Sequence, residues 1–155
     1  MQESAGLDAV YDGEQQRTEM YQWAVAHSNG FEWRGSVRAF DNKYYSKAAV
    51  VEAPSVEGAY DVEEFRFVAS HTDRAVKVPL TGAYTMVDWS YDEHYAAAGR
   101  LGASGERRLE ARRRFVRDVA ERVVLPNVAG LVEAGADWIQ IDEPEIGRAS
   151  CRERV

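Results

Sequence analysis

The chain has 155 residues, and its 19 basic and 26 acidic side chains give a formal net charge of −7. This acidic balance argues against a general nucleic-acid-binding protein, which needs a basic face for phosphates. Hydrophobic residues make up 45% of the chain and charged residues 29%, and no apolar run approaches the roughly 20 residues of a membrane helix, so we expect a soluble, cytoplasmic, globular protein.

The order of apolar, turn-forming and proline residues predicts alternating strands and helices. In chain order we expect a strand at 7–11, a helix at 15–27, extended segments at 35–39 and 48–52, a helix at 62–70, a strand at 75–80, a long helical region at 105–134 and a strand at 138–141. The expected turns and loops between them lie at 12–14, 28–30, 54–58 and 81–85. Strands that alternate with helices indicate parallel βαβ units.

The long helical region contains Pro126. Because proline lacks the backbone donor that a helix needs, we expect a break or kink there, followed by a second helix at 127–133 that ends at Gly135. The arginines between 107 and 117 are expected on a solvated helix face. The apolar side chains expected on buried faces are Phe65, Phe67 and Val68 in the helix at 62–70, and Leu109, Val116, Val119 and Val123 in the long helix.

The length of the chain limits the possible architecture. A complete (β/α)₈ barrel needs about 250 residues, and this chain has 155. The α/β pattern therefore fits either a small open sheet or a fragment that forms about half of a (β/α)₈ TIM barrel.

The last residues resemble translated sequencing-adapter DNA. The resemblance runs over residues 145–155, with Glu145 straddling the junction. We therefore expect 1–144 to be the native part of the barrel and 145–155 to be a non-native tail that includes Cys151, the single cysteine. The alternative is a natural terminus that is frayed, as termini often are.

Polar side chains follow three predicted strands, at the point where each strand ends. These are Asp12 and Glu14 after the first strand, the loop 81–85 with Trp89 beyond it, and Asp142 after the last strand. In barrels and in open α/β sheets, the site residues lie at the carboxyl ends of the strands. Carboxylates from two such ends are suited to grip an amine or to accept a proton.

Each of these residues also has a purely structural interpretation. Asp12 is suited to cap the following helix, and Glu14 to be a solvated first-turn residue favoured by the helix dipole. Asp142 fits a turn shortly before a proline. Trp89 fits either a packed core indole or an aromatic wall for a flat substrate ring.

The sequence offers little for a metal site. His71 and His94 are the candidates, but a zinc site needs three or four ligands, and no second histidine or cysteine lies at ligand spacing from His94. The sequence also contains no phosphate-binding glycine motif and no nucleophilic serine elbow.

Three segments, taken in order, resemble the C-terminal catalytic domain of cobalamin-independent methionine synthase. The last of them, which ends in Gln-Ile-Asp-Glu-Pro, is the most specific. The segments are residues 6–14 with Arg17 and Met20, residues 77–85 with Trp89 and Ser90, and residues 134–144.

This resemblance implies a (β/α)₈ barrel that transfers a methyl group from a methyl-folate-type donor to the thiol of homocysteine, in methionine biosynthesis. It implies that Glu14 and Asp142 bind the homocysteine amino group and that Trp89 and Lys47 contact the methyl donor. It also implies a zinc ion that binds the homocysteine thiol and lowers its pKa. The zinc ligands of the family lie after the segment that corresponds to Pro144, so none is expected here.

The sequence departs from the family pattern around Lys47. The stretch 44–49 lacks the arginine and cysteine of the family, and Ala83 stands where proline is frequent. The methyl donor is therefore open, and a corrinoid-dependent methyltransferase or a relative of uroporphyrinogen decarboxylase is the alternative enzyme. The non-enzymatic alternative is a small α/β binding domain. We expect the isolated chain to be inactive and prone to aggregate, because half a barrel exposes strand edges.

Overall fold

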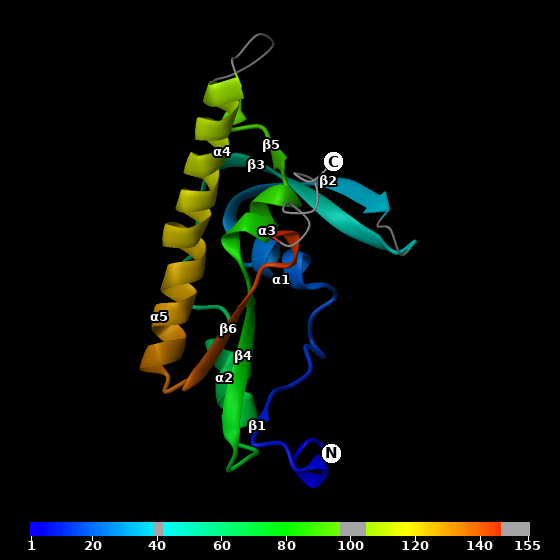
Figure 1. The fold of residues 1–155 in the computed structure, drawn as a ribbon, viewed down its shortest axis with the longest axis vertical. Coiled ribbons are helices and arrows are strands. Elements are labelled where there is room, and N and C mark those ends of the chain that lie inside the picture. The colour runs from blue at the N-terminus through cyan, green and yellow to red at the C-terminus, as the bar shows by residue number, and fades with distance from the viewer. Residues whose placement is uncertain (39–41, 97–104, 147–155) are drawn as a thin grey trace.

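The computed structural model describes residues 1–38, 42–96 and 105–146 (Figure 1). In chain order its elements are η1 (Glu3–Ala5), β1 (Ala9–Val10), α1 (Met20–Ala26), β2 (Asn29–Arg38), β3 (Tyr44–Ser55), α2 (Val62–Ala69), β4 (Ala75–Thr81), α3 (Ala83–Asp88), β5 (Tyr91–Asp92), α4 (Gly105–Val119), the π-helical turn η3 (Ala120–Val124), α5 (Leu125–Glu133) and β6 (Trp138–Asp142). Within these ranges, no helix is long and apolar enough to span a membrane. Most of the predicted tail at 145–155 lies outside the described residues.

A parallel sheet in the order β1-β4-β6 forms one half of the molecule. Its central strand β4 buries Val76, Val78 and Leu80, which pack against Phe65 of α2 and Leu131 of α5. A strand with neighbours on both sides and a helical layer on one face is expected to be this apolar. The predicted α/β fold with parallel βαβ units is confirmed, and the sheet of the described residues does not close into a barrel.

The second half is built on a long hairpin. Strands β2 and β3 are antiparallel, and the short strand β5 pairs with β3 in parallel. Both hairpin strands are longer than the predicted segments at 35–39 and 48–52, and Pro54 belongs to β3 rather than to the expected loop. Gly30 allows this extension, because it has a φ of +87° and a Cβ there would lie 2.9 Å from the carbonyl oxygen of Glu52.

The larger hydrophobic core lies between the hairpin and the helices α1, α3 and α4. On α4 the buried side chains are Phe115 and Val119, continued by Val123 of η3. Their spacing of four residues places them on one helix face. The prediction was right for Val119 and Val123 and missed Phe115, whereas Leu109 and Phe67, which it expected to be buried, are exposed.

The helical backbone runs through Pro126 without the predicted break. Figure 1 shows α4 and α5 as one continuous column beside β6. The five residues before Leu125 form a π turn, in which the Leu125 amide donates to the carbonyl of Ala120. Pro126 then lies in the first turn of α5, and the wider π turn directly before it accommodates the missing backbone donor. The helix ends before Gly135, whose φ is +95°, as predicted.

Candidate functional site

The strands β1, β4 and β6 are parallel and adjacent, but β1 pairs with Ala75 and Val76 at the start of β4, whereas β6 pairs with the rest of β4 up to its carboxyl end. Thr81 at the end of β4 pairs with Asp142 at the end of β6. The amide of Gly82, just beyond Thr81, donates to the carbonyl of Asp142 at 2.9 Å. Asp142 thus lies beside the carboxyl end of β4, whereas Glu14 lies four residues beyond the end of β1.

Glu14 lies in a tight turn after β1. The Glu14 amide donates to Oδ1 of Asp12 at 2.8 Å, and Glu14 has a φ of +57°. The predicted role of Asp12 as cap of the next helix is therefore wrong. The helix begins later than predicted, at Met20, and its cap is Glu19, which accepts from the Gln22 amide at 3.0 Å. A turn in which the Arg17 amide donates to the Glu14 carbonyl at 3.0 Å occupies the first residues that periodicity assigned to the helix.

A buried arginine holds the loop that carries Glu14. The side chain of Arg17 is only 2% exposed, and it donates to Glu64 at 2.8 Å, to Asp61 at 3.2 Å and to the carbonyl oxygen of Pro79 at 3.1 Å. It also reaches Oε1 of Glu14 at 3.3 Å, while the Glu14 side chain keeps 35% of its surface exposed. Arg17 thus fixes one oxygen of Glu14 and leaves the carboxylate accessible.

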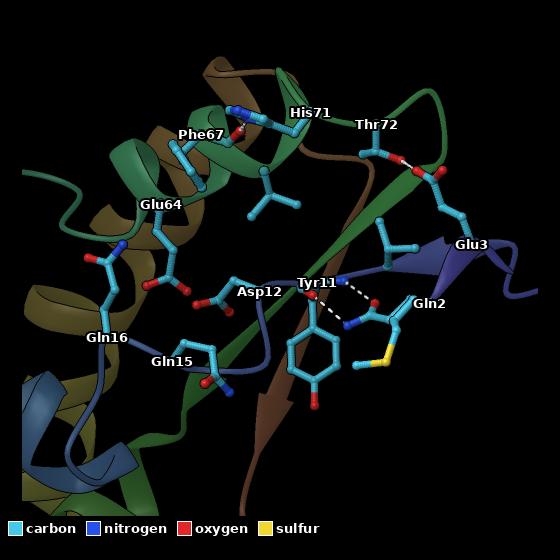
Figure 2. A pocket seen from close by; sticks show the side chains of 13 residues that line it. Gln2, Glu3, Tyr11, Asp12, Gln15, Gln16, Glu64, Phe67, His71 and Thr72 are labelled. Atoms are coloured by element: carbon cyan, nitrogen blue, oxygen red, sulfur yellow. Dashed lines mark hydrogen bonds between the residues drawn. The ribbon is translucent and has the colours of Figure 1, made fainter. Parts of the chain in front are cut away.

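Glu64 is the most perturbed carboxyl of this cluster. Burial raises its pKa to about 7, and Arg17 opposes the shift by attraction and by a hydrogen bond. The nearby Asp12 adds to the rise, and the two carboxyl groups point toward one another in Figure 2. Among the described residues, the buried Oδ2 of Asp12 has no hydrogen-bond partner. The effect of desolvation on the Glu64 pKa outweighs the attraction of the Arg17 guanidinium, because several carboxylates share that one positive charge.

Asp142 is the last residue of β6, so the interpretation as a turn residue is wrong. Its Oδ1 accepts from Nε2 of Gln140 at 2.7 Å, and Gln140 in turn accepts from Nζ of Lys77 at 3.1 Å. Residues 140 and 142 share a face of the strand, since side chains alternate. A rigid strand end therefore orients the Asp142 carboxylate.

The predicted loop 81–85 is instead made of Thr81 at the end of β4, the N-cap Gly82 and the first three residues of helix α3. The carboxylate of Glu143 accepts from the amides of Tyr84 and Thr85 at 2.9 and 2.7 Å, and from the Thr85 hydroxyl at 2.7 Å. These are free donors of the first helical turn, which a side-chain acceptor stabilises. No local pattern in the sequence indicates this cap, because Glu143 is 58 residues away from Thr85.

Trp89 ends α3 and is partly buried. Its indole ring packs against Tyr21 and Tyr45, with centroid distances of 5.8 and 5.2 Å, and its Nε1 donates to Glu145 at 2.9 Å. Trp89 is thus a packed indole that retains some accessible surface. Glu145, which the sequence assigns to the junction of the tail, is buried in this contact.

Lys47 lies on β3 close to the end of α3. Its Nζ is 4.4 Å from the ring centroid of Tyr91. Burial lowers the pKa of Lys47, and the negative charge of Asp88 at the end of α3 opposes that shift. Lys47 and Trp89 therefore belong to the hairpin side of the molecule, whereas Glu14 and Asp142 follow strands of the parallel sheet.

The described residues do not fit a zinc site. They bring together no group of three or more His, Cys, Asp and Glu side chains. His71 bonds through Nδ1 to the Phe67 carbonyl at 2.7 Å, and the ring of His94 packs edge-on against Tyr95. Both histidines are placed by neighbours on their own segments.

A pocket of about 490 Å³ lies between η1, β1 and α2 (Figure 2). Gln2 crosses it, donating to the Tyr11 carbonyl at 2.8 Å and accepting from the Tyr11 amide at 3.0 Å. The Gln2 side-chain amide thus makes the two backbone hydrogen bonds that a neighbouring strand would make at the free edge beyond β1. The pocket is lined by Asp12 and Glu64 but not by the four predicted site residues, so it is not the predicted substrate site.

The whole chain is similar to one known family. The family described as "Cobalamin-independent synthase, Catalytic domain" matches residues 1–154. The methionine synthases of Pyrococcus abyssi and Pyrococcus furiosus are 37% and 35% identical over 143 residues, which is 92% of this chain and 38% of each relative. A solved B12-independent methionine synthase from a Shewanella species, in complex with selenomethionine, superimposes with a TM-score of 0.72 at 30% identity, again over 92% of this chain and 38% of that one. The chain thus spans well under half the length of these relatives.

Proposed function

Because the chain belongs to the cobalamin-independent methionine synthase family, we propose that residues 1–144 form about half of the (β/α)₈ catalytic barrel of a methyltransferase. The parallel sheet β1-β4-β6 supports this, since its strands follow one another in chain order with helices between them. Further strands on both free edges would close such a sheet. The non-native origin of 145–155 and the cytoplasmic location are part of the same proposal.

The proposed reaction transfers a methyl group to the thiol of homocysteine and makes methionine. Its main support is a pair of carboxylates from one parallel sheet, Glu14 in the turn after β1 and Asp142 at the end of β6. A pair of carboxylates suits an ammonium group, because charge-assisted hydrogen bonds are strong and directional. The Shewanella relative is in complex with selenomethionine, an amino acid of the product type.

The proposed donor subsite consists of Trp89 and Lys47. The accessible part of the Trp89 indole offers a flat apolar surface to a ring of the donor. A methyl-folate-type donor is our first candidate. The second candidate is a corrinoid donor, which the cation–π contact of Lys47 with Tyr91 favours, because an engaged cation is less available to the anionic tail of a folate.

In this proposal, a zinc ion would supply the thiol activation, because it would lower the pKa of a bound thiol. The described residues of this chain do not provide its ligands, so we expect the ligands in a longer protein. The residues of this chain bind and orient the amino acid through Glu14 and Asp142, and they orient the donor through Trp89.

The test uses the intact protein encoded by the complete reading frame, loaded with zinc. Methionine formation from homocysteine is measured with methyltetrahydrofolate and, separately, with methylcobalamin as donor. We expect turnover with at least one donor, and the preferred donor decides between the two candidates. The absence of methionine with both donors would contradict the proposed function.

A further inference from the structure

Glu143 lies between the two proposed subsites. It follows Asp142 directly in the chain, and its carboxylate closes the first turn of α3 through three hydrogen bonds of 2.7–2.9 Å. The Asp142 carbonyl accepts a fourth hydrogen bond in this region, from the Gly82 amide at 2.9 Å. Hydrogen bonds to the Asp142 carbonyl and to the Glu143 side chain therefore hold the end of β6 and the start of α3 together.

Gly82 provides the space for this carboxylate. A Cβ at position 82 would lie 2.2 Å from the carboxyl carbon of Glu143, which is too short a distance for two non-bonded atoms. Gly82 has an ordinary extended backbone, with φ −77° and ψ 160°, so its conformation does not require glycine. The close approach of Glu143 is what excludes a side chain.

Helix α3 connects these hydrogen bonds to the donor side. It has six residues, and it buries Ala83, Thr85, Met86 and Val87 against the larger core. Trp89 caps its other end, where the Trp89 amide donates to the Thr85 carbonyl at 3.0 Å. Thr85 thus bonds to Glu143 through its amide and hydroxyl and to Trp89 through its carbonyl, so a shift of the first turn moves the indole.

We propose that Glu143 is a positioning residue that sets the separation between the amino-acid subsite at Asp142 and the donor subsite at Trp89. This inference rests on the function proposed above. Methyl transfer needs the two reactants at a fixed separation, and a misplacement of about 1 Å costs roughly 100-fold in rate. Loss of the Glu143 hydrogen bonds therefore lowers kcat, whereas homocysteine still binds to Glu14 and Asp142.

The test compares Glu143→Gln with Glu133→Gln, a matched control on the exposed end of α5, in the intact zinc-loaded protein. The amide that the first substitution introduces presents only one oxygen to the three donors of α3. We expect kcat to fall by about 10- to 100-fold, with the KM for homocysteine changed by less than about threefold. Hydrogen exchange at residues 82–88 is expected to accelerate in the same variant. The control should match the wild type in all three measurements.

A double variant distinguishes positioning from general stability. If Glu143 acts through Trp89, then adding Glu143→Gln to Trp89→Phe lowers kcat by much less than Glu143→Gln does alone. Fully multiplicative effects would overturn the inference, as would a wild-type kcat in Glu143→Gln. If that variant does not fold, Thr85→Val removes only the hydroxyl bond, and an unchanged kcat in this variant overturns the inference as well. A wild-type protein without turnover instead overturns the proposed function, and the role of Glu143 fails with it.

Discussion

At the scale of single residues, the cluster around Arg17 gives the structure a pH dependence. The pKa of Glu64 is raised from its ordinary value near 4.5 to about 7 by burial. Between these two values the folded protein binds a proton that the unfolded chain has released. The contribution of Glu64 to stability is therefore present at low pH and is lost as the pH rises toward 7.

We therefore predict that Glu64→Gln flattens the pH profile of the free energy of unfolding between about pH 5 and pH 8. The wild type should lose more stability than this variant as the pH rises, as measured by urea denaturation of the intact protein at several pH values. The control is Glu63→Gln on the same helix, whose side chain is 87% exposed. Parallel profiles for wild type and Glu64→Gln would show that Glu64 is not the titrating group.

Gly82 allows a second prediction at this scale. In Gly82→Ala the new methyl group collides with the Glu143 carboxyl at 2.2 Å, so the cap of α3 must move. We expect a loss of about 1–3 kcal/mol in the free energy of unfolding, as for other overpacked sites. Gly58→Ala is the control, since nothing lies within 4 Å of a Cβ at Gly58. Equal stability of both variants would contradict the close packing of Glu143.

The sequence predicted some of the site residues and missed others for a physical reason. Glu14 and Asp142 were proposed from the order of the strands alone, because the site residues of barrels follow the carboxyl ends of parallel strands, and their role stays a prediction. Glu143 and the buried role of Arg17 depend on partners far away in the chain, at Thr85 and Glu64. No local spacing encodes such contacts.

At the scale of elements, α4 shows how a periodic pattern can mislead. The apolar residues of α4 are compatible with more than one buried helix face. The prediction placed Leu109 on the buried face, whereas in the structure Phe115 is buried and Leu109 is exposed. The ring of Phe115 stacks on Tyr95 at 4.9 Å and lies 6.3 Å from Phe31. Only the tertiary partners decide between such faces.

We predict that Phe115→Ala lowers the free energy of unfolding by about 3–5 kcal/mol, as large-to-small changes in a core do. Leu109→Ala, on an exposed position of the same helix, should change it by no more than about 0.5 kcal/mol. Thermal or urea denaturation of the intact protein measures both. Similar losses in the two variants would contradict the assignment of Phe115 to the core and Leu109 to the surface.

The π turn before Pro126 could be predicted only in part. Proline requires that a backbone carbonyl lose its partner, so an irregularity was foreseeable. Whether the chain breaks, kinks or widens depends on what packs against it. Val119 before the turn, Val123 within it and Leu131 after it are all fully buried, and widening to a π turn keeps these contacts.

At the scale of the whole molecule, the sheet of the described residues has free edges at β1 and β6. The Gln2 side chain covers part of the edge beyond β1, while Trp138 and Ile141 of β6 are 53% and 45% exposed. Parallel strands are ordinarily covered on both faces, so these side chains indicate surfaces suited to further packing.

We therefore predict that the isolated 155-residue chain aggregates and has no methyltransferase activity, because free strand edges and exposed apolar side chains promote association. Light scattering and a methionine assay, with the intact protein as the control, measure both properties. A monomeric chain that melts cooperatively and turns over would contradict this prediction.

In the proposed function, Glu14 and Asp142 bind the amino group of homocysteine. The most direct measurement compares homocysteine with 4-mercaptobutyrate, which lacks only that amino group, as methyl acceptors of the intact protein. The wild type should prefer homocysteine in kcat/KM by about 10- to 100-fold, the range of a charge-assisted hydrogen bond of roughly 1.5–3 kcal/mol. In Glu14→Gln and Asp142→Asn this preference should shrink while activity toward 4-mercaptobutyrate persists. A preference that stays unchanged in both variants would contradict the claim.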